Sequence, residues 1–479
     1  MTSSLKNVYT SKDIDVRELT LFNFSVGKQL SFVDLTRSTI EFSVYEDLWS
    51  NFMSADITVQ DNQGMIETIP IFGEELIRIK FKTPTFKNFI DKLFVIYKID
   101  KRQNMNERTD VYTLSLISIE NIVSMISTVD DSYVGKEISE IVNLVYFNYI
   151  YNSSKTFGRL NEFKFNAEPK DIFVEDTQGL QSFIAPTNTP FDFMSYLTTE
   201  AQSIEYEESD FVLYEDRDKF NFRTISSLID TDPVDSFYLA DPSVKQYSDT
   251  KVKKYQIIEK LQYDNQFDLI ERIASGMYDN TVKTIDPILK KYEEIDFNYY
   301  NETLPPSTFK GLGNWPVISQ WSVYKNLNGE SYSKYIVGNL SDDEYYKTSY
   351  LDNRTIDADR NVFDPYTRYP FRKHLFLNTR TSKLSQLHNG IRLSISIPGN
   401  TDLKVGDVIN VFVPQNRTTV ESEAKYNFFF GQEKPKFLIT ALTHRYSYKE
   451  ELYYTMLEVV KDTFDKQIRD NTDKEEIFT

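Results

Sequence analysis

Carboxylates are the side chains of this chain with the clearest capacity for chemistry. The sequence has 72 Asp and Glu residues, and eight of them lie within the stretch 200–218. A pair of carboxylates can hydrolyse a glycosidic bond when one is held protonated and the other ionised. No apolar pattern singles out one pair here, so we interpret the cluster as a solvated acidic face. Its members are Glu200, Glu205, Glu207, Glu208, Asp210, Glu215, Asp216 and Asp218.

Metal and cofactor chemistry has few candidate residues. The sequence has no Cys and three His, which excludes disulfides, thiolate nucleophiles and cysteine-based zinc sites. Asp357, Asp359 and Asn361 match the first ligand positions of an EF-hand loop, but Val362 and Arg368 stand where Gly and a bidentate acid are needed. An EF-hand is therefore excluded, while a looser oxygen-rich cation site stays open. The sequence has no nucleophile elbow, phosphate loop or dinucleotide fingerprint, so we predict no cofactor and no catalytic centre.

The charge balance and the apolar runs restrict the partners of this protein. The formal net charge is −18, so the chain repels phosphates and tight nucleic-acid binding is not expected. A protein past which nucleic acid must slide would show the same balance, and so would an acidic surface that resists aggregation. No apolar run approaches the roughly 18 residues of a membrane span, and the first residues lack the basic-then-apolar layout of a secretory signal.

One strand–loop–strand pattern occurs twice in the sequence. In the first copy Phe94–Ile99 is followed by polar residues and then by Tyr112–Leu116. In the second copy Phe437–Leu442 is followed by the polar stretch His444–Glu451 and then by Tyr454–Glu458. Phe and Tyr are 18 residues apart in the first copy and 17 in the second. Each copy predicts two strands joined by a long polar loop. A duplicated β module is one explanation, and a chance match between two hairpins is the other.

The length and composition predict several domains with packed cores. Of the 479 residues 40% are hydrophobic and 15% aromatic, and aromatic residues favour strands. We predict an α+β, β-rich multidomain fold with two similar β modules of the barrel or sandwich type and mixed α/β insertions. The expected boundaries are 1–120 for the first β domain, 121–249 for a mixed α+β domain, 250–299 plus 379–465 for a split second β domain, 300–378 for a loop-rich insertion and 466–479 for a charged tail.

Four passages together carry a resemblance to a known family. They are Gly399–Ile409 with the helix and alternating strand before it, Phe437–Asp462, Ile69–Glu75, and Phe267–Asp286. The passages extend over most of the chain and keep the family order. In them the chain resembles the central baseplate hub protein of T-even-like contractile-tailed bacteriophages. The region 300–378 and the extra length depart from the family pattern, which leaves the domain boundaries and the peripheral contacts open.

The resemblance implies an assembly. Each chain would carry two tail-tube-like β modules, so that a homotrimer forms a pseudo-six-fold ring. The ring would join the hexameric tail tube protein to a trimeric spike protein and continue the DNA channel, through which DNA passes without specific binding. Other baseplate proteins and the tape-measure protein are further implied partners. The implied location is the virion tail baseplate after assembly in the host bacterial cytoplasm, without membrane insertion, and the implied role is structural.

The same passages point to residues with a structural role. Glycines would supply backbone angles that other residues avoid, and Asn and Asp side chains would cap a turn. The residues are Pro70, Ile71 and Gly73 in the first module and Gly399, Asn400, Asp402, Gly406 and Asp407 in the second.

Two other functions stay open at this point. One is a hub component of a secretion or injection system, which the lack of a glycine-rich β-helix repeat in the sequence disfavours. The other is a virion-associated carbohydrate-active enzyme. The 32 Tyr and 35 Phe would suit stacking on sugars, but the missing secretory signal and the missing catalytic constellation count against it.

Overall fold

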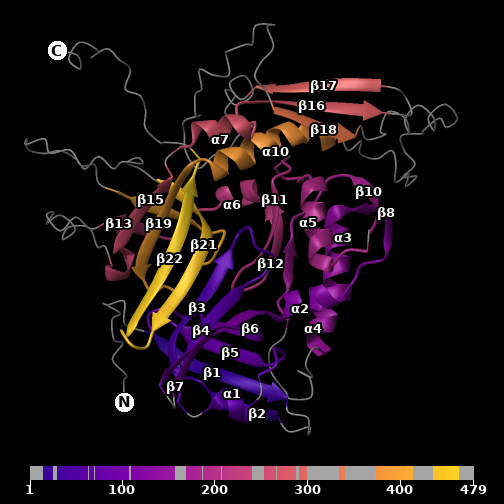
Figure 1. Ribbon diagram of the computed structural model, residues 1–479. Helices are drawn as coiled ribbons and strands as arrows, with labels where there is room; N and C mark the ends of the chain where they lie inside the picture. The colour runs from indigo at the N-terminus through magenta and orange to yellow at the C-terminus, as the bar shows by residue number, and fades with distance from the viewer. Residues whose placement is uncertain are drawn as a thin grey trace, which may run out of the picture.

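The computed structural model shows an α+β protein that is rich in strands, as predicted (Figure 1). It describes residues 14–24, 30–62, 64–69, 71–106, 109–156, 169–185, 187–206, 208–239, 253–265, 267–286, 291–298, 334–339, 373–413 and 435–462. Pro70, Glu207 and the candidate cation ligands Asp357, Asp359 and Asn361 lie outside these ranges. Within the described ranges, no helix has the length and apolar character needed to cross a membrane.

The first module is an antiparallel sheet built from the N-terminal strands. Its elements are β1 (Asp15–Phe24), β2 (Leu30–Asp34), β3 (Thr39–Asp47), β4 (Ser54–Asp61), α1 (Met65–Thr68), β5 (Leu76–Lys82), β6 (Ile90–Asn106) and β7 (Thr109–Ser118). The strand order across the sheet is β3-β4-β7-β6-β5-β1-β2. Alternation along β4 defines the inner face, because Ala55, Ile57 and Val59 are buried and the residues between them are not.

The second module is a sheet of strands that lie far apart in the sequence. Its elements are β13 (Ser236–Leu239), β14 (Ile257–Ile258), β15 (Lys260–Asn265), β19 (Ile391–Pro398), β20 (Val408–Phe412), β21 (Lys436–Ser447) and β22 (Leu452–Lys461). The pairings run β15-β19-β22-β21-β20-β13-β14. The predicted alternating strand is confirmed as β19, in which Leu393, Ile395 and Ile397 are buried in the core of this module.

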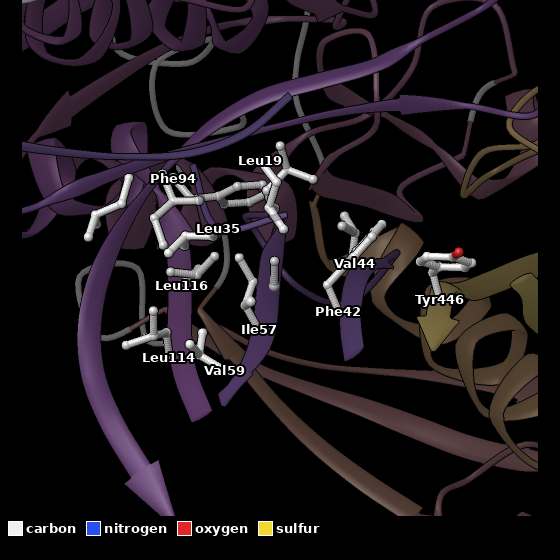
Figure 2. Packing of buried hydrophobic residues seen from close by; sticks show 14 of the residues in the cluster. Leu19, Leu35, Phe42, Val44, Ile57, Val59, Phe94, Leu114, Leu116 and Tyr446 are labelled. Carbon is white, nitrogen blue, oxygen red and sulfur yellow. The ribbon is translucent and has the colours of Figure 1, made fainter. Parts of the chain in front are cut away.

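The core of the first module contains residues from both ends of the chain. Figure 2 shows Ile57, Leu114 and Phe94 of the first module, and Tyr446 of β21 on the far side of Phe42. The ring centroids of Tyr446 and Phe42 lie 5.8 Å apart. Each large buried apolar side chain contributes roughly 1.5–3 kcal/mol to folding, so this shared core holds the two modules together.

A mixed α/β part lies between the two modules in the sequence, and its helices gather at one side of the sheets (Figure 1). Its elements are α2 (Ile119–Ile126), β8 (Ser132–Glu137), α3 (Ile138–Val145), the π-helical segment η1 (Tyr146–Tyr151), α4 (Asn152–Thr156), β9 (Ile172–Val174), β10 (Leu180–Ile184), α5 (Pro190–Glu200), β11 (Phe211–Glu215), β12 (Phe220–Thr224) and α6 (Ile225–Ile229). The Thr189 side chain caps the start of α5, because it accepts a hydrogen bond from the Asp192 amide.

A further layer is inserted between β15 and β19. It contains α7 (Leu269–Ala274), β16 (Asp279–Asp286), β17 (Lys291–Asn298), β18 (Lys334–Asn339) and α10 (Lys373–His388). The strand order is β17-β16-β18, and these strands form a sheet of their own. Figure 1 shows α10 between this sheet and the second module. Within the expected range 250–299, therefore, β14 and β15 join the second module, whereas β16 and β17 join the inserted layer.

Candidate functional site

The two hairpins found in the sequence have the same register as far as Asp100 in the first and Thr443 in the second. In the first, Val95 and Ile96 pair with Ile117 and Leu116, and the register then shifts by one residue before Lys98 pairs with Ser115. The second hairpin repeats this pattern: Leu438 pairs with Val460, Ile439 with Val459, and after the same shift Ala441 with Glu458. The residues at the two β-bulges, Tyr97 and Thr440, are counterparts. The first β-bulge therefore stands at the same place in both copies of the pattern.

The structure corrects two details of that repeat. By register the counterpart of Tyr112 is Thr455, one residue beyond the Tyr454 that the sequence comparison suggests. The predicted long polar loops are mostly strand, because β6 continues to Asn106 and β21 to Ser447. His444 therefore lies in a strand and is fully buried, so its interpretation as a loop residue is wrong.

The neighbouring strands correspond as well. Leu76 of β5 pairs with Val95, and Val408 of β20 pairs with Leu438, the counterpart of Val95. On the other side of the first hairpin, β7 pairs with β4 and β4 pairs with β3. On the other side of the second hairpin, β22 pairs with β19 and β19 pairs with β15. All four pairings are antiparallel. Among the described residues, β3, β4, β7, β6 and β5 thus match β15, β19, β22, β21 and β20 in order and direction.

The two glycine-containing passages are closed by equivalent hydrogen bonds in the two modules. The amide of Ile96 donates to the Glu75 carbonyl, and the amide of Ile439 donates to the Asp407 carbonyl, both at 2.9 Å. The carboxylate of Glu75 accepts from the amide three residues before it, at 2.8 Å, and that of Asp407 does the same at 3.1 Å. An acid before β5 and β20 thus closes both turns, and burial raises the pKa of Asp407 to about 6.

The three glycines meet different requirements. Gly73 and Gly406 have φ angles of 98° and 86°, in the left-handed region that favours glycine. A Cβ on Gly73 would meet only the Ile96 carbonyl oxygen, at 3.6 Å, whereas a Cβ on Gly406 would lie 2.6 Å from the Tyr214 hydroxyl. Gly399 is needed for space, because a Cβ there would lie 1.8 Å from the ring of Tyr453.

The other residues of the second turn connect both modules. Asn400 is buried, and its side-chain oxygen accepts from the Asp402 amide at 2.9 Å. The Asp402 carboxylate accepts from Asn88 of the first module at 3.1 Å. Thr401 and Thr83 exchange hydrogen bonds, each amide donating to the other hydroxyl at 3.2 Å. Sequence reasoning missed this threonine pair, since nothing in the sequence relates two residues so far apart. Ile71 packs against the first core.

The modules join edge to edge through β3 and β21. The two strands are antiparallel, from Asp47 opposite Ala441 to Glu41 opposite Ser447. One edge of β21 pairs along its length with β22, while the other edge pairs first with β20 and then with β3. Burial lowers the pKa of His444 to about 3, so this residue enters the shared core as a neutral ring, and its Nδ1 lies 2.9 Å from the Tyr453 hydroxyl.

The predicted acidic face is wrong for most of its members. Glu208, Asp210, Glu215 and Asp216 are buried beside lysines that are remote in sequence, and Glu200 is buried as well. Lys170 lies 3.0 Å from the Glu215 carboxylate, Lys383 lies 3.0 Å from Asp210, and Lys404 lies 3.2 Å from Asp216. Lys92 also contacts Glu215. Burial opposes the ionisation of Glu215, but the nearby Lys170 and Lys92 ammonium groups outweigh it and lower the pKa of Glu215 to about 2. These carboxylates join the mixed part to both modules.

Glu46 lies at the same junction. It belongs to β3, is buried, and accepts a hydrogen bond from the Val405 amide of the second module at 3.2 Å. Burial and the nearby Asp216 carboxylate raise the pKa of Glu46 to about 8. Among the described residues, no group of three or more metal-ligating side chains could hold an ion.

The comparisons with known proteins concern the fold. No protein-family model and no curated protein matches this chain. A tail protein from Neisseria meningitidis MC58 is similar in structure, with 9% identity, coverage of 94% of this chain and 97% of that chain, and a TM-score of 0.50. The 43 kDa tail protein of prophage MuSo2 from Shewanella oneidensis has 8% identity, coverage of 94% and 100%, and a TM-score of 0.49. The chain shares the fold of the Neisseria meningitidis tail protein.

Proposed function

We propose that this chain is a structural subunit of a phage tail baseplate, and that three copies form a ring of six β modules. The observation that carries the proposal is the repeated five-strand arrangement with the same bulge after Ile96 and Ile439. The shared fold with a tail protein supports the setting in a tail.

The way in which the modules join supports a ring. The β3·β21 contact uses a different edge of each module, so it is a head-to-tail contact that can be repeated. A head-to-tail contact builds a closed ring when its rotation is a whole fraction of a turn. Each chain would supply one such step internally, and three chains would supply six similar modules. The ring could then match a six-fold partner on one face and a three-fold partner on the other.

The proposed partners follow from this symmetry. The hexameric tail tube protein would bind one face and a trimeric spike protein the other, with other baseplate proteins and the tape-measure protein close by. The net charge of −18 suits a bore through which DNA moves without sticking. The proposed location is the tail baseplate of the virion after assembly in the host cytoplasm.

A structural role also agrees with the environment of the acidic residues. Glu215 and Asp210, which could have formed part of a glycosidase pair, are each neutralised by buried lysines. A carboxylate held ionised by two ammonium groups is a poor proton donor at neutral pH. We therefore propose that the protein is not an enzyme.

Native mass spectrometry of the full chain, alone and with a candidate spike protein, tests the ring. We expect a species of three times the chain mass of 56.2 kDa. Averaged electron micrographs of that species should show six similar densities around a pore. A chain that stays monomeric at all concentrations, with and without the spike protein, would contradict the proposal. A trimer that assembles on a secretion-system spike and on no phage spike would favour the injection-machine alternative.

A further inference from the structure

The half of β6 from Lys98 onward, called its far half here, has one edge without a described partner strand, whereas the equivalent edge of β21 pairs with β3. The first half of β6 pairs with β5 from Ile90 to Val95. From Lys98 onward β6 pairs with β7 alone, and no other described strand lies beside it. The corresponding half of β21, from Ala441 onward, pairs with β3. A two-stranded ribbon that leaves its sheet is only marginally stable in water, and Lys101–Met105 are all exposed.

The strand that would match this edge is β15. It is the counterpart of β3, and it pairs along one edge with β19. On its other edge no described strand lies beside it. The residues Gln262–Asp264 of β15 are exposed, whereas the counterpart β3 is covered by β21.

We propose that β15 of one copy pairs antiparallel with the far half of β6 of the next copy, as β3 pairs with β21 within the chain. This inference rests on the proposed ring and names the surface by which neighbouring copies join. Each chain then has one internal junction and contributes one half to each of two external junctions, so three copies use every such edge and the ring closes.

The register of the internal junction predicts the register of the external one. Thr443 lies opposite Tyr45. Lys98 of β6 is the counterpart of Ala441 of β21. Two residues further along each strand, Asp100 is therefore the counterpart of Thr443. Tyr45 pairs with Ser54, and Ser54 pairs with Ile117. In the second module Asn265 pairs with Arg392, and Arg392 pairs with Val460, the counterpart of Ile117. Tyr45 and Asn265 are therefore counterparts.

Asp100 of one copy is therefore expected opposite Asn265 of the next. Both side chains are partly exposed, so the two residues can meet without rearrangement of a core.

The external junction differs from the internal one in its side chains. His444 and Tyr446 of β21 enter the core of the first module. The same stretch of β6 carries Lys101 and Gln103, and Lys101 sits at a bulge with a φ of 52°. Main-chain hydrogen bonds must therefore supply most of the external contact, which makes it weaker than the internal one. Bulges and lysines on an edge also protect a free chain from indiscriminate strand pairing.

Engineered disulfides test this inference, because the chain has no native Cys. The variant Asp100→Cys/Asn265→Cys is oxidised as full-length protein and run on a non-reducing gel. Facing residues in antiparallel strands have Cα atoms about 4.5–5.5 Å apart, which suits a disulfide. We expect covalent dimers and trimers that disappear on reduction. An equimolar mixture of the two single variants should stop at dimers.

Two matched variants interpret the result. Tyr45→Cys/Thr443→Cys joins the facing residues of the internal junction. Its disulfide should form within one chain, so the protein should remain a monomer on the non-reducing gel. Formation of this disulfide shows that the strands are folded. Asp100→Cys/Glu140→Cys places the second thiol on the exposed surface of α3 and should give no trimer.

The outcomes separate the two proposals. A native trimer whose Asp100→Cys/Asn265→Cys variant does not cross-link would overturn this junction and leave the ring intact. A chain that stays monomeric and forms no cross-link would overturn both the junction and the ring.

Discussion

At the scale of single residues, the turns before β5 and β20 share a closing acid but differ in the position of the positive-φ glycine. Gly73 stands two residues before Glu75, and Gly406 stands one residue before Asp407. A Cβ on Gly406 would lie 2.6 Å from the Tyr214 hydroxyl, whereas a Cβ on Gly73 would make an ordinary contact of 3.6 Å with the Ile96 carbonyl oxygen. The first turn is more open, and Phe72 beside Gly73 is 80% exposed. A side chain is therefore more costly at Gly406 than at Gly73.

Alanine substitutions should separate these effects. Gly73→Ala should cost about 1–2 kcal/mol, the penalty of a left-handed conformation for a residue with a Cβ. Gly406→Ala should cost roughly 2–5 kcal/mol, because overpacking against Tyr214 and Leu228 adds to the same penalty. Urea unfolding monitored by tryptophan fluorescence checks both variants. Equal losses for the two variants would show that the contact with Tyr214 is unimportant.

Glu46 predicts how stability depends on pH. Its pKa is raised from 4.5 to about 8 in the folded protein, so between these values the folded chain binds more protons than the unfolded chain. The contribution of Glu46 to stability therefore falls as the pH rises from about 4.5 to 8, by an upper bound of roughly 5 kcal/mol. Lys170, the hydrogen bond from the Val405 amide and Arg217 act in the opposite direction and lower the pKa of Glu46.

The variant Glu46→Gln tests this dependence, since it mimics the protonated form at every pH. Its melting temperature should be close to that of the parent chain near pH 5 and higher at pH 8.5. Thermal scans from pH 5 to 8.5 provide the measurement. Parallel pH profiles of the two proteins would show that Glu46 does not titrate in this range.

At the scale of elements, buried lysine–carboxylate contacts join elements of the first module to the mixed part. Lys92 of β6 contacts Glu120 of α2 at 3.0 Å and also Glu215 of β11. Lys170 and the amide of Met53 complete the surroundings of Glu215. Such a cluster adds less stability than its contacts suggest, because burying charges is costly, but the loss of one partner leaves an uncompensated charge.

Removal of one lysine should show this asymmetry. Lys92→Met should destabilise the protein by about 3–5 kcal/mol, because Glu120 loses its buried partner and Glu215 loses one of two. Lys80→Met is the matched control, since Lys80 and Asp91 are both about one third exposed and such pairs contribute roughly 0–1 kcal/mol. Urea midpoints of both variants provide the comparison. Similar shifts would mean that burial does not govern the effect.

At the scale of the whole molecule, the two modules share a sheet arrangement but differ in what is inserted between equivalent strands. A short turn joins β3 to β4, whereas the inserted layer with α7, the β16–β18 sheet and α10 separates β15 from β19. In the proposed ring the sheets would repeat six times and the insertions three times. Partners of three-fold symmetry would therefore be recognised by the insertions, and the mass and cross-linking measurements test the ring at this scale.

Part of this organisation could be predicted from the sequence, because it depends on local patterns. The alternation of Ile and Leu with Arg and Ser predicted β19, and a Thr followed by Pro, as at the start of α5, is typical of a helix N-terminus. The two hairpins and the two glycine turns were also found, although only strand register showed that the turns are counterparts. Such features follow from the period of buried side chains and from backbone angles, which nearby residues determine.

The tertiary structure decided what depends on residues that are remote in sequence. The sequence shows Asp210 and Glu215 as members of an acidic run, and only the fold brings Lys92, Lys170 and Lys383 beside them. His444 was interpreted as a loop residue because a polar stretch surrounds it, yet the pairing of β21 with β3 buries it in the core of the other module. Local patterns determine which segments become strands, whereas burial and charge pairing depend on which segments meet, and a single sequence does not encode that as a local signal.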